Sequence, residues 1–322
     1  MGNVKITRKE VSDINCIKVE NSSTGEYFLV YPEYGANLMD LNLKIDDRLV
    51  SVIESFKSTK DIKKGGNFRS AVLIPFPNRI RNGIYNYNGR EYRLQVDEKA
   101  RDNAIHGFVY NKPFDLSYIE NRDDEIEACF ECYYNGDLEG YPFPFKANII
   151  YKLLCHGNFE CVISVENLSC EKIPIGVGWH PYLRLPSKID DLYLSLPPVI
   201  IHELDEMKIP TGRRKNFDLF ADPNPIGNLR MDSTFEIMNS GLEKAETRLI
   251  DKKNNISLEI WQDAGKGRYN YIQIFTSLDR QSIAVEPMTC NIDAFNNDMG
   301  LQILSPRDKL ELTCGIKIRR WY

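Results

Sequence analysis

Two histidines of this chain lie in short segments where glycine and proline restrict or reshape the backbone. His180 lies in the run 176–182, Gly-Val-Gly-Trp-His-Pro-Tyr, and His106 lies between Ile105 and Gly107. Glycine tolerates positive φ and lets a ligand approach the backbone, while proline fixes φ. Imidazole exchanges a proton near neutral pH, so each segment is a candidate proton-transfer site, although a buried structural histidine explains either one taken alone.

A glutamate in a third segment could complete an acid and base set. Glu286 ends the apolar run Ile283-Ala284-Val285 and precedes Pro287. A carboxylate in partly desolvated surroundings has a raised pKa, which suits a general base. An ordinary glutamate at a strand end is the alternative interpretation of the same pattern.

Two further polar positions stand out from their apolar surroundings. Asn78 and Arg79 follow Pro77 in an otherwise apolar run, where a guanidinium needs a partner. That partner is either a carboxylate in a salt bridge or a group such as a hydroxyl or a developing oxyanion. Asp232 follows a loop and precedes a predicted strand, and taken alone it is an ordinary turn or cap residue.

Composition excludes several classes of protein. The chain has 322 residues and a net charge of −5 with scattered Lys and Arg, so a nucleic-acid partner is not expected. No run approaches 18 apolar residues and no secretory signal precedes the first strand, which predicts a cytoplasmic protein that does not span a membrane. The eight cysteines are expected to be reduced thiols, and Cys129 and Cys132, on opposite faces of a predicted strand, are not expected to bind metal.

The pattern of the whole chain predicts many short strands and no long amphipathic helix. Apolar and polar residues alternate in segments bounded by Gly, Asn, Asp and Pro, for example at 27–31, 41–45, 125–130, 147–151, 159–165, 191–196, 256–261 and 271–275. Asn88-Gly89 between tyrosine-containing segments predicts a hairpin. Residues 57–66 read as a polar loop. We expect an all-β, antiparallel sandwich or barrel forming one domain over residues 1–322.

Taken together in order, several short motifs give the chain a resemblance to a known family. They are the segments 31–36 (YPEYGA), 78–80 (NRI), 105–107 (IHG), 179–182 (WHPY), 209–212 (IPTG), 232–235 (DSTF), 272–275 (IQIF) and 285–289 (VEPMT). The set resembles the aldose 1-epimerase (galactose mutarotase) family over nearly the whole chain. The resemblance implies a large antiparallel β-sandwich, the galactose mutarotase-like supersandwich, with a sugar site in a cleft on one face.

The resemblance also implies a reaction and residue roles. The reaction interconverts the α and β anomers of a free hexose such as glucose or galactose through ring opening, without a cofactor or a metal. Glu286 would be the base for the anomeric hydroxyl and His180 the acid for the ring oxygen, on opposite sides of the hemiacetal. The remaining implied site residues are His106 and Arg79 beside the ring oxygen, and Asn78, Asp232 and Gln273 on sugar hydroxyls.

Three alternatives remain open from the sequence. Arg81 and Lys112 lie near presumed site residues, so a hexose phosphate could be the substrate of a mutarotase. Asp232 and Glu286 could serve as the two carboxylates of a glycoside hydrolase, which would leave both histidines without a role. A non-catalytic sugar-binding protein could share the same fold, because a shared fold does not imply a shared reaction. Whether the chain forms a homodimer is also open.

Overall fold

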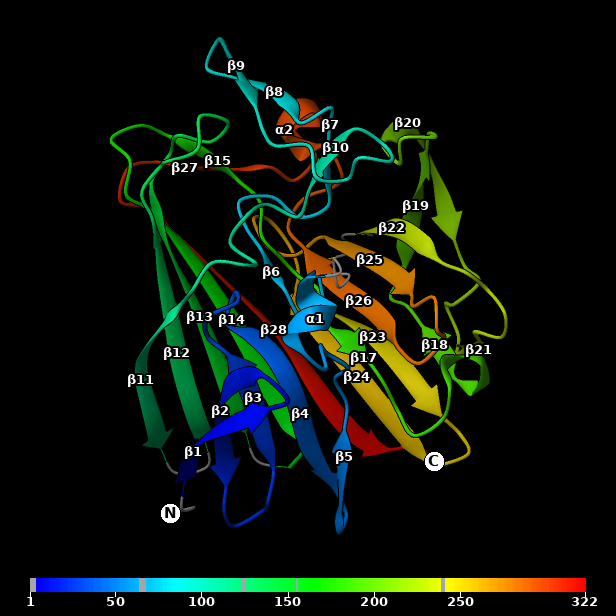
Figure 1. The fold of residues 1–322 in the computed structure, drawn as a ribbon. Coiled ribbons are helices and arrows are strands. Elements are labelled where there is room, and N and C mark those ends of the chain that lie inside the picture. Colours follow the sequence, from blue (N-terminus) through cyan, green and yellow to red (C-terminus); the bar gives the residue numbers. More distant parts are fainter. Residues whose placement is uncertain (1–3, 64–67, 123–124, 155, 239–240) are drawn as a thin grey trace.

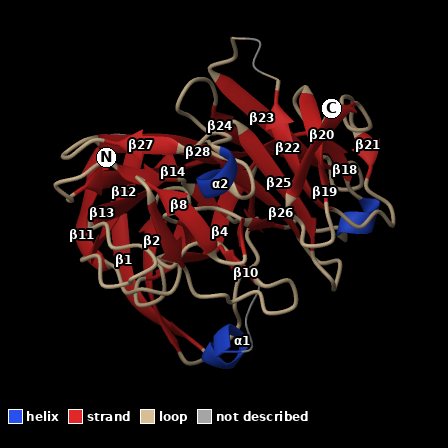
Figure 2. Cartoon of the chain, turned by 90° about the horizontal axis from the view of Figure 1, so that it is seen from above, coloured by secondary structure: helices blue, strands red, loops and turns tan. Residues whose placement is uncertain are grey.

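A computed structural model describes residues 4–63, 68–122, 125–154, 156–238 and 241–322, and β-strands dominate these residues (Figures 1 and 2). Antiparallel pairing joins the named strands into three large sheets and three two-stranded ribbons. The predicted all-β class and antiparallel arrangement are therefore confirmed. No helix among the described residues is long and apolar enough to cross a membrane.

The largest sheet has nine strands, and its central strands show why the sequence forms it. Along β13 every second side chain is buried, as expected for a strand with one face on the core. The strands in spatial order are β11 (Asp115–Arg122), β12 (Glu125–Tyr134), β13 (Phe145–Leu154), β14 (Asn158–Asn167), β28 (Lys309–Arg320), β24 (Ile256–Asp263), β23 (Lys244–Asp251), β18 (Tyr193–Ser195) and β21 (Asn224–Pro225).

Two smaller sheets lie against the nine-stranded sheet. The five-stranded sheet lies on the side of β11 and the eight-stranded sheet lies on the side of β21 (Figure 1). The five-stranded sheet contains β1 (Val4–Val11), β2 (Ile14–Asn21), β3 (Tyr27–Tyr31), β4 (Asn37–Ile45) and β5 (Arg48–Ser51). The eight-stranded sheet contains β20 (Pro210–Phe217), β19 (Val199–Leu204), β22 (Asp232–Ile237), β25 (Tyr271–Thr276), β26 (Ile283–Met288), β16 (Gly178–Trp179) and β6 (Val72–Leu73), with β17 (Tyr182–Leu183) also paired to β26.

Short ribbons and helices complete the described structure. The ribbons pair β7 (Arg79–Arg81) with β10 (Asn103–Ile105), β15 (Ile173–Ile175) with β27 (Gln302–Leu304), and β8 (Ile84–Tyr87) with β9 (Arg90–Arg93). The helices are α1 (Thr59–Lys63), α2 (Ala294–Asn297) and a 3₁₀ turn at Ile189–Asp191. Helix α1 lies inside the segment predicted as a loop, and residues 64–66 of that segment lie outside the described residues.

The predicted hairpin at Asn88-Gly89 is confirmed. These two residues connect β8 to β9, and both have positive φ, 50° at Asn88 and 77° at Gly89. A two-residue turn of this kind has the twist that antiparallel strands need, and Asn-Gly is the pair that adopts it at least cost. The sequence signal therefore acts through backbone conformation.

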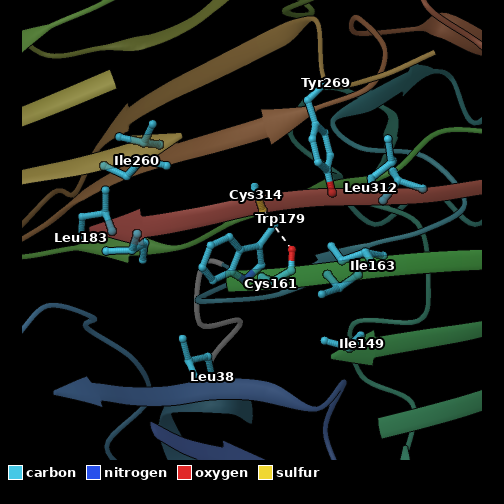
Figure 3. Packing of buried hydrophobic residues seen from close by; sticks show 14 of the residues in the cluster. Leu38, Ile149, Cys161, Ile163, Trp179, Leu183, Ile260, Tyr269, Leu312 and Cys314 are labelled. Carbon is cyan, nitrogen blue, oxygen red and sulfur yellow. Dashed lines mark hydrogen bonds between the residues drawn. The ribbon is translucent and has the colours of Figure 1, made fainter. Parts of the chain in front are cut away.

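The three large sheets share one buried hydrophobic cluster. Figure 3 shows Trp179 of β16 lying among Leu38 of β4, Ile163 of β14 and Leu183 of β17, one residue from each large sheet. Trp179 is fully buried. Replacing a buried tryptophan by alanine costs about 3–5 kcal/mol, so this residue anchors the junction of the sheets. The next residue along the chain is His180.

Candidate active site

Three neighbouring strands of the eight-stranded sheet place polar side chains in one row. Glu286 of β26 pairs with Gln273 of β25, and Gln273 pairs with Thr234 of β22. Residues directly opposite each other in a sheet project from the same face, and so do residues two apart on one strand. Asp232, two residues before Thr234, therefore joins the row. Strand pairing alone brings together three of the residues implied by the resemblance.

Gln273 connects this row through its side-chain amide. Its Nε2 donates to Asp232 Oδ1 at 2.8 Å, and its Oε1 accepts a short hydrogen bond from the Thr234 hydroxyl. Gln273 is 2% exposed, whereas the side chain of Asp232 is 27% exposed. Asp232 also contacts Lys208, with Oδ2 and Nζ 3.3 Å apart. The row thus runs from the buried Glu286 to a carboxylate that solvent reaches.

His180 enters the same region from the end of β16. Its N–H donates to the Ala71 carbonyl and its carbonyl accepts from Ser70 N–H, both at 2.9 Å. Because side chains alternate along an extended chain, Trp179 faces the core and His180 faces away from it. The glycines of this segment serve packing rather than positive φ. A Cβ on Gly176 would lie 2.8 Å from Pro77 Cδ, and neither Gly176 nor Gly178 has positive φ.

His180 and Glu286 contact each other directly, with Nε2 and Oε1 3.2 Å apart. We expected them on opposite sides of a hollow, but antiparallel pairing of β16 with β26 sets the two side chains next to each other. Both are buried, and burial disfavours the charged form of each group. Burial lowers the pKa of His180 to about 3 and raises the pKa of Glu286 well above its usual value, with repulsion from Asp232 adding to the latter.

Two buried polar atoms of this pair have no hydrogen-bond partner among the described residues. They are His180 Nδ1 and Glu286 Oε2. A buried polar group without a partner costs about 1–3 kcal/mol, so folded proteins keep few of them. Groups that supply hydrogen bonds to both atoms would offset this cost, and a polyhydroxylated ligand carries such groups.

His106 is held in one protonation state by Asn78. The Asn78 backbone N–H donates to His106 Nδ1 at 3.1 Å. The His106 backbone N–H donates in return to the Asn78 carbonyl at 2.9 Å. Because Nδ1 accepts a hydrogen bond, the proton of the neutral ring is on Nε2. Burial and the nearby His180 also lower the pKa of His106 well below its usual value. His106 is therefore a neutral N–H donor, with its ring centroid 5.2 Å from that of His180.

Arg79 has the carboxylate partner that its apolar surroundings require. Its Nε and Nη2 donate to the two oxygens of Glu98 at 2.8 and 3.0 Å, and Nη1 donates to Asn78 Oδ1 at 3.1 Å. The salt bridge considered from the sequence is present. A guanidinium has five N–H donors, so these three bonds leave two for a ligand. Glu98, which also binds Arg101 and Asn103, was not identified from the sequence, because no local pattern marks it.

A second unpredicted feature is an aromatic and cationic stack behind His180. The Tyr182 ring is nearly parallel to the His180 imidazole, with centroids 5.1 Å apart, and the Arg69 guanidinium lies 4.9 Å from the Tyr182 centroid. Arg69 also contacts Glu54, with Nη1 and Oε1 3.2 Å apart. The positive charge of Arg69 contributes to the lowered pKa of His180. This stack fixes the ring plane of the imidazole.

The ligand atoms of His106, His180 and Glu286 lie within 4.8 Å of one another, which raises the question of a metal. A metal-bound imidazole normally coordinates through one nitrogen and donates a hydrogen bond from the other. His106 has the opposite arrangement, because its Nδ1 accepts the Asn78 N–H and its Nε2 carries the proton. This donor set does not fit a cation, and we assign none to it.

The basic residues that suggested a phosphate each contact a residue outside the set implied by the resemblance. Arg81 forms a short ion pair with Asp205, and the Lys112 ammonium lies over the Tyr134 ring, 5.5 Å from its centroid. Each therefore has its own local partner. Asp232, the second carboxylate of the hydrolase alternative, accepts a hydrogen bond from Gln273 through Oδ1 and contacts Lys208 through Oδ2.

Sequence comparison decides the family to which this arrangement belongs. The aldose 1-epimerase family matches residues 17–317, which includes every strand of the site. The chain belongs to the aldose 1-epimerase family. The resemblance seen in the short motifs is thereby confirmed.

Individual relatives of the chain show different degrees of similarity. The uncharacterized protein YihR of Escherichia coli K12 is 27% identical over 311 residues, 94% of each chain. Human galactose mutarotase is 24% identical over 184 residues, 56% of this chain and 52% of the human one.

Solved structures show the same fold as this chain. A galactose mutarotase-like protein from Clostridium acetobutylicum has a TM-score of 0.86 at 20% identity, covering 99% of both chains. A galactose 1-epimerase from Lactobacillus acidophilus has a TM-score of 0.80 at 17% identity, covering 100% of both chains. The predicted mutarotase-like sandwich is therefore confirmed as the fold.

Proposed function

We propose that this protein is an aldose 1-epimerase that interconverts the anomers of a free hexose such as glucose or galactose. The observation that supports this most is the buried contact of 3.2 Å between His180 Nε2 and Glu286 Oε1. The anomeric hydroxyl and the ring oxygen of a pyranose are bonded to the same carbon, C1. Two groups in contact can therefore serve both oxygens, one as base and the other as acid.

The reaction then needs one proton taken and one given. The base removes the proton from the C1 hydroxyl, a C1=O double bond forms, and the bond from C1 to the ring oxygen breaks. The acid protonates that oxygen, which gives the open-chain aldehyde. After rotation about the C1–C2 bond, the same steps in reverse close the ring on the other face of the carbonyl. No redox change or cofactor is required.

Burial determines where the shared proton lies before a sugar binds. Because the neutral forms of both side chains are favoured, the proton is on Glu286, whereas the roles implied by the family place it on His180. A sugar hydroxyl that donates to the unpartnered Oε2 of Glu286 favours the ionised carboxylate. Substrate binding would therefore move the proton across the contact to His180 and prepare the pair for ring opening.

The remaining residues have supporting roles in this proposal. His106 donates its Nε2 hydrogen to the ring oxygen as negative charge develops there, which a fixed neutral donor can do without reorganisation. Arg79 supplies its two remaining N–H donors on the same side. Asn78, Asp232 and Gln273 bind sugar hydroxyls, and Asp232 is the most solvent-accessible of the three.

Polarimetry tests the proposal directly. Freshly dissolved α-D-glucose or α-D-galactose should reach its equilibrium rotation faster with the protein than without it, at a rate proportional to protein concentration. A parallel reaction with a hexose 6-phosphate tests the phosphorylated alternative. If no sugar reacts faster while free hexose still raises the melting temperature, the protein is a sugar-binding protein and the catalytic proposal is wrong.

A further inference from the structure

Phe68 lies against both imidazoles of the candidate site and has no role in the proposed reaction. Its ring centroid is 4.6 Å from that of His106 and 6.4 Å from that of His180. Phe68 is partly exposed, whereas both imidazoles are 5% exposed. The ring therefore packs beside the two imidazoles, in a residue that solvent partly reaches.

The backbone holds this ring in place through two strained residues. Phe68 and Ser70 both have left-handed conformations, with φ of 53° and 56°. Residues other than glycine rarely adopt this conformation, and the strain is kept where the surrounding structure enforces it. Here Ser70 N–H donates to the His180 carbonyl at 2.9 Å and Ala71 N–H donates to the Phe68 carbonyl at 3.0 Å. Ser70 and Ala71 therefore connect the backbone of Phe68 to the backbone of His180.

A pyranose has a chemical feature that matches an aromatic ring beside an acid and base pair. Its hydroxyls project mainly around the rim, while axial C–H bonds form an apolar face. The face of an aromatic ring carries partial negative charge, which attracts the weakly positive hydrogens of C–H bonds. Polar side chains that hold the rim and an apolar ring that covers the face are the usual composition of a small-molecule site.

We propose that Phe68 is a substrate-binding residue whose ring packs on the apolar C–H face of the sugar. The ligands that it favours are pyranoses with axial hydrogens at C3 and C5 on the same face, as in both anomers of glucose and galactose. This inference rests on the proposed function, because it uses the same site and substrate class. It adds a hydrophobic contact to a set of side chains that is otherwise entirely polar.

Binding of unreactive sugars tests the inference without relying on turnover. The probes are 1,5-anhydro-D-glucitol and 1,5-anhydro-D-galactitol, which keep the ring and lack the anomeric hydroxyl. By calorimetry, Phe68→Leu should weaken binding of at least one probe about five- to tenfold, because leucine keeps apolar volume and loses the aromatic face. Phe68→Trp, which keeps an aromatic ring, should bind the same probe within about twofold of the native affinity. In polarimetry the leucine variant should show a raised KM and a nearly unchanged kcat.

Tyr110→Leu is the matched control, because the Tyr110 ring lies 4.9 Å from that of Phe68 and contacts neither imidazole among the described ring pairs. It should leave probe affinity unchanged. Equal losses in Phe68→Leu and Tyr110→Leu, or no loss in Phe68→Leu, would overturn the inference. If the protein fails to accelerate mutarotation but Phe68→Leu still selectively weakens binding, the catalytic proposal falls and the stacking role stands.

Discussion

The eight-stranded sheet contains two contacts between a histidine and a glutamate, and their surroundings differ. His202 Nε2 lies 3.0 Å from Glu236 Oε2, about as close as His180 lies to Glu286. The Asn291 amide donates to His202 Nδ1 at 3.4 Å, so Nε2 carries the proton and donates to Glu236. Arg214 donates to the same Glu236 oxygen at 2.9 Å, and the side chain of Glu236 is 25% exposed.

The pair at Glu286 lacks these supports. Glu286 has no cation in ion-pair contact among the described residues, and one polar atom on each side chain has no partner. The difference teaches that a contact between imidazole and carboxylate does not by itself indicate chemistry. The partly buried pair is also bonded by an amide and a guanidinium, so both of its side chains have further partners. A fully buried and incompletely bonded pair can instead change protonation when a ligand arrives.

The largest difference in kcat is expected between the Glu286→Gln and Glu236→Gln variants. The first substitution keeps the shape and removes the base, so kcat in polarimetry should fall by about 10²–10⁴. Sugar affinity measured by calorimetry should stay within a few fold. Glu236→Gln should leave kcat within about twofold, because that carboxylate has no part in the reaction. Retained turnover in Glu286→Gln would refute the assignment of the base.

His180→Asn should cause the next largest loss, about 10²-fold or more in kcat, whereas His202→Asn should affect stability more than rate.

The double variant His180→Asn with Glu286→Gln tests whether the two side chains act together. Because the two residues share one proton, the double variant should be about as slow as the slower single variant. Multiplicative losses in the same polarimetric assay would show that the two side chains act independently.

Asp232→Ala should weaken substrate binding before it affects turnover. A hydrogen bond to a charged group contributes about 1.5 kcal/mol or more, so KM should rise about tenfold with a smaller change in kcat. Lys208→Ala is the control for the neighbouring cation, which contacts the same carboxylate. Steady-state polarimetry over a range of sugar concentrations separates the two parameters. A pure kcat defect in Asp232→Ala would mean that Asp232 is misplaced in the proposal.

The dependence of activity on pH should show no step at the ordinary histidine pKa of about 6.5. The lowered pKa of His180, about 3, means that the pair takes up a second proton only as the pH falls towards that value. The pair loses its shared proton only as the pH rises through the raised pKa of Glu286. kcat/KM, which reports the groups of the free enzyme, should therefore fall only towards pH 3 on the acid side and through the raised pKa of Glu286 on the basic side, as measured by polarimetry over a range of pH.

Removing the positive charge of Arg69, which lies beside the stacked rings of Tyr182 and His180, is a second test of the pH dependence. Arg69→Met should raise the pKa of His180, because it removes a positive charge that opposes protonation. The acid side of the pH profile should then move to higher pH. A sharp loss of kcat/KM as the pH falls through about 6.5 in the native protein would show that His180 is not in the buried pair when it acts.

The smallest effect is expected from removal of metal ions. Dialysis against a chelator should leave kcat unchanged, because His106 presents an N–H donor where a metal ligand would need a lone pair. The measurement is polarimetry before and after dialysis, followed by addition of Zn²⁺. Loss of activity on dialysis and recovery with Zn²⁺ would show that the three-residue cluster binds a cation after all.

The sequence predicted features that depend on local pattern. Alternation of apolar and polar residues gave the strand class, Asn88-Gly89 gave a hairpin, and the ordered motifs gave the family. Gln273 and Glu286 lie on adjacent strands in register, so their meeting follows once the family's fold is assumed. The strand pattern and the hairpin turn are encoded within a few residues of where they appear.

Other features depend on which distant segments meet, and the sequence did not reveal them. Glu98 as the partner of Arg79, the stack of Arg69 on Tyr182 and the His202–Glu236 contact each join segments far apart in the chain. The direct contact of His180 with Glu286 was also missed, since motif order says nothing of separation in space. Charge and aromatic character were visible, but the partner of each group was not.

The two-residue strand Gly178–Trp179 couples the packing of the core to the position of His180. Its indole is wedged at the junction of the three large sheets, and the imidazole that follows projects the opposite way. Loosening the interior would rotate this strand and withdraw His180, the proposed proton donor, at the same moment. Heat inactivation should accordingly track loss of the interior, while new sugar preferences can evolve at Asp232 and Phe68 without weakening the scaffold.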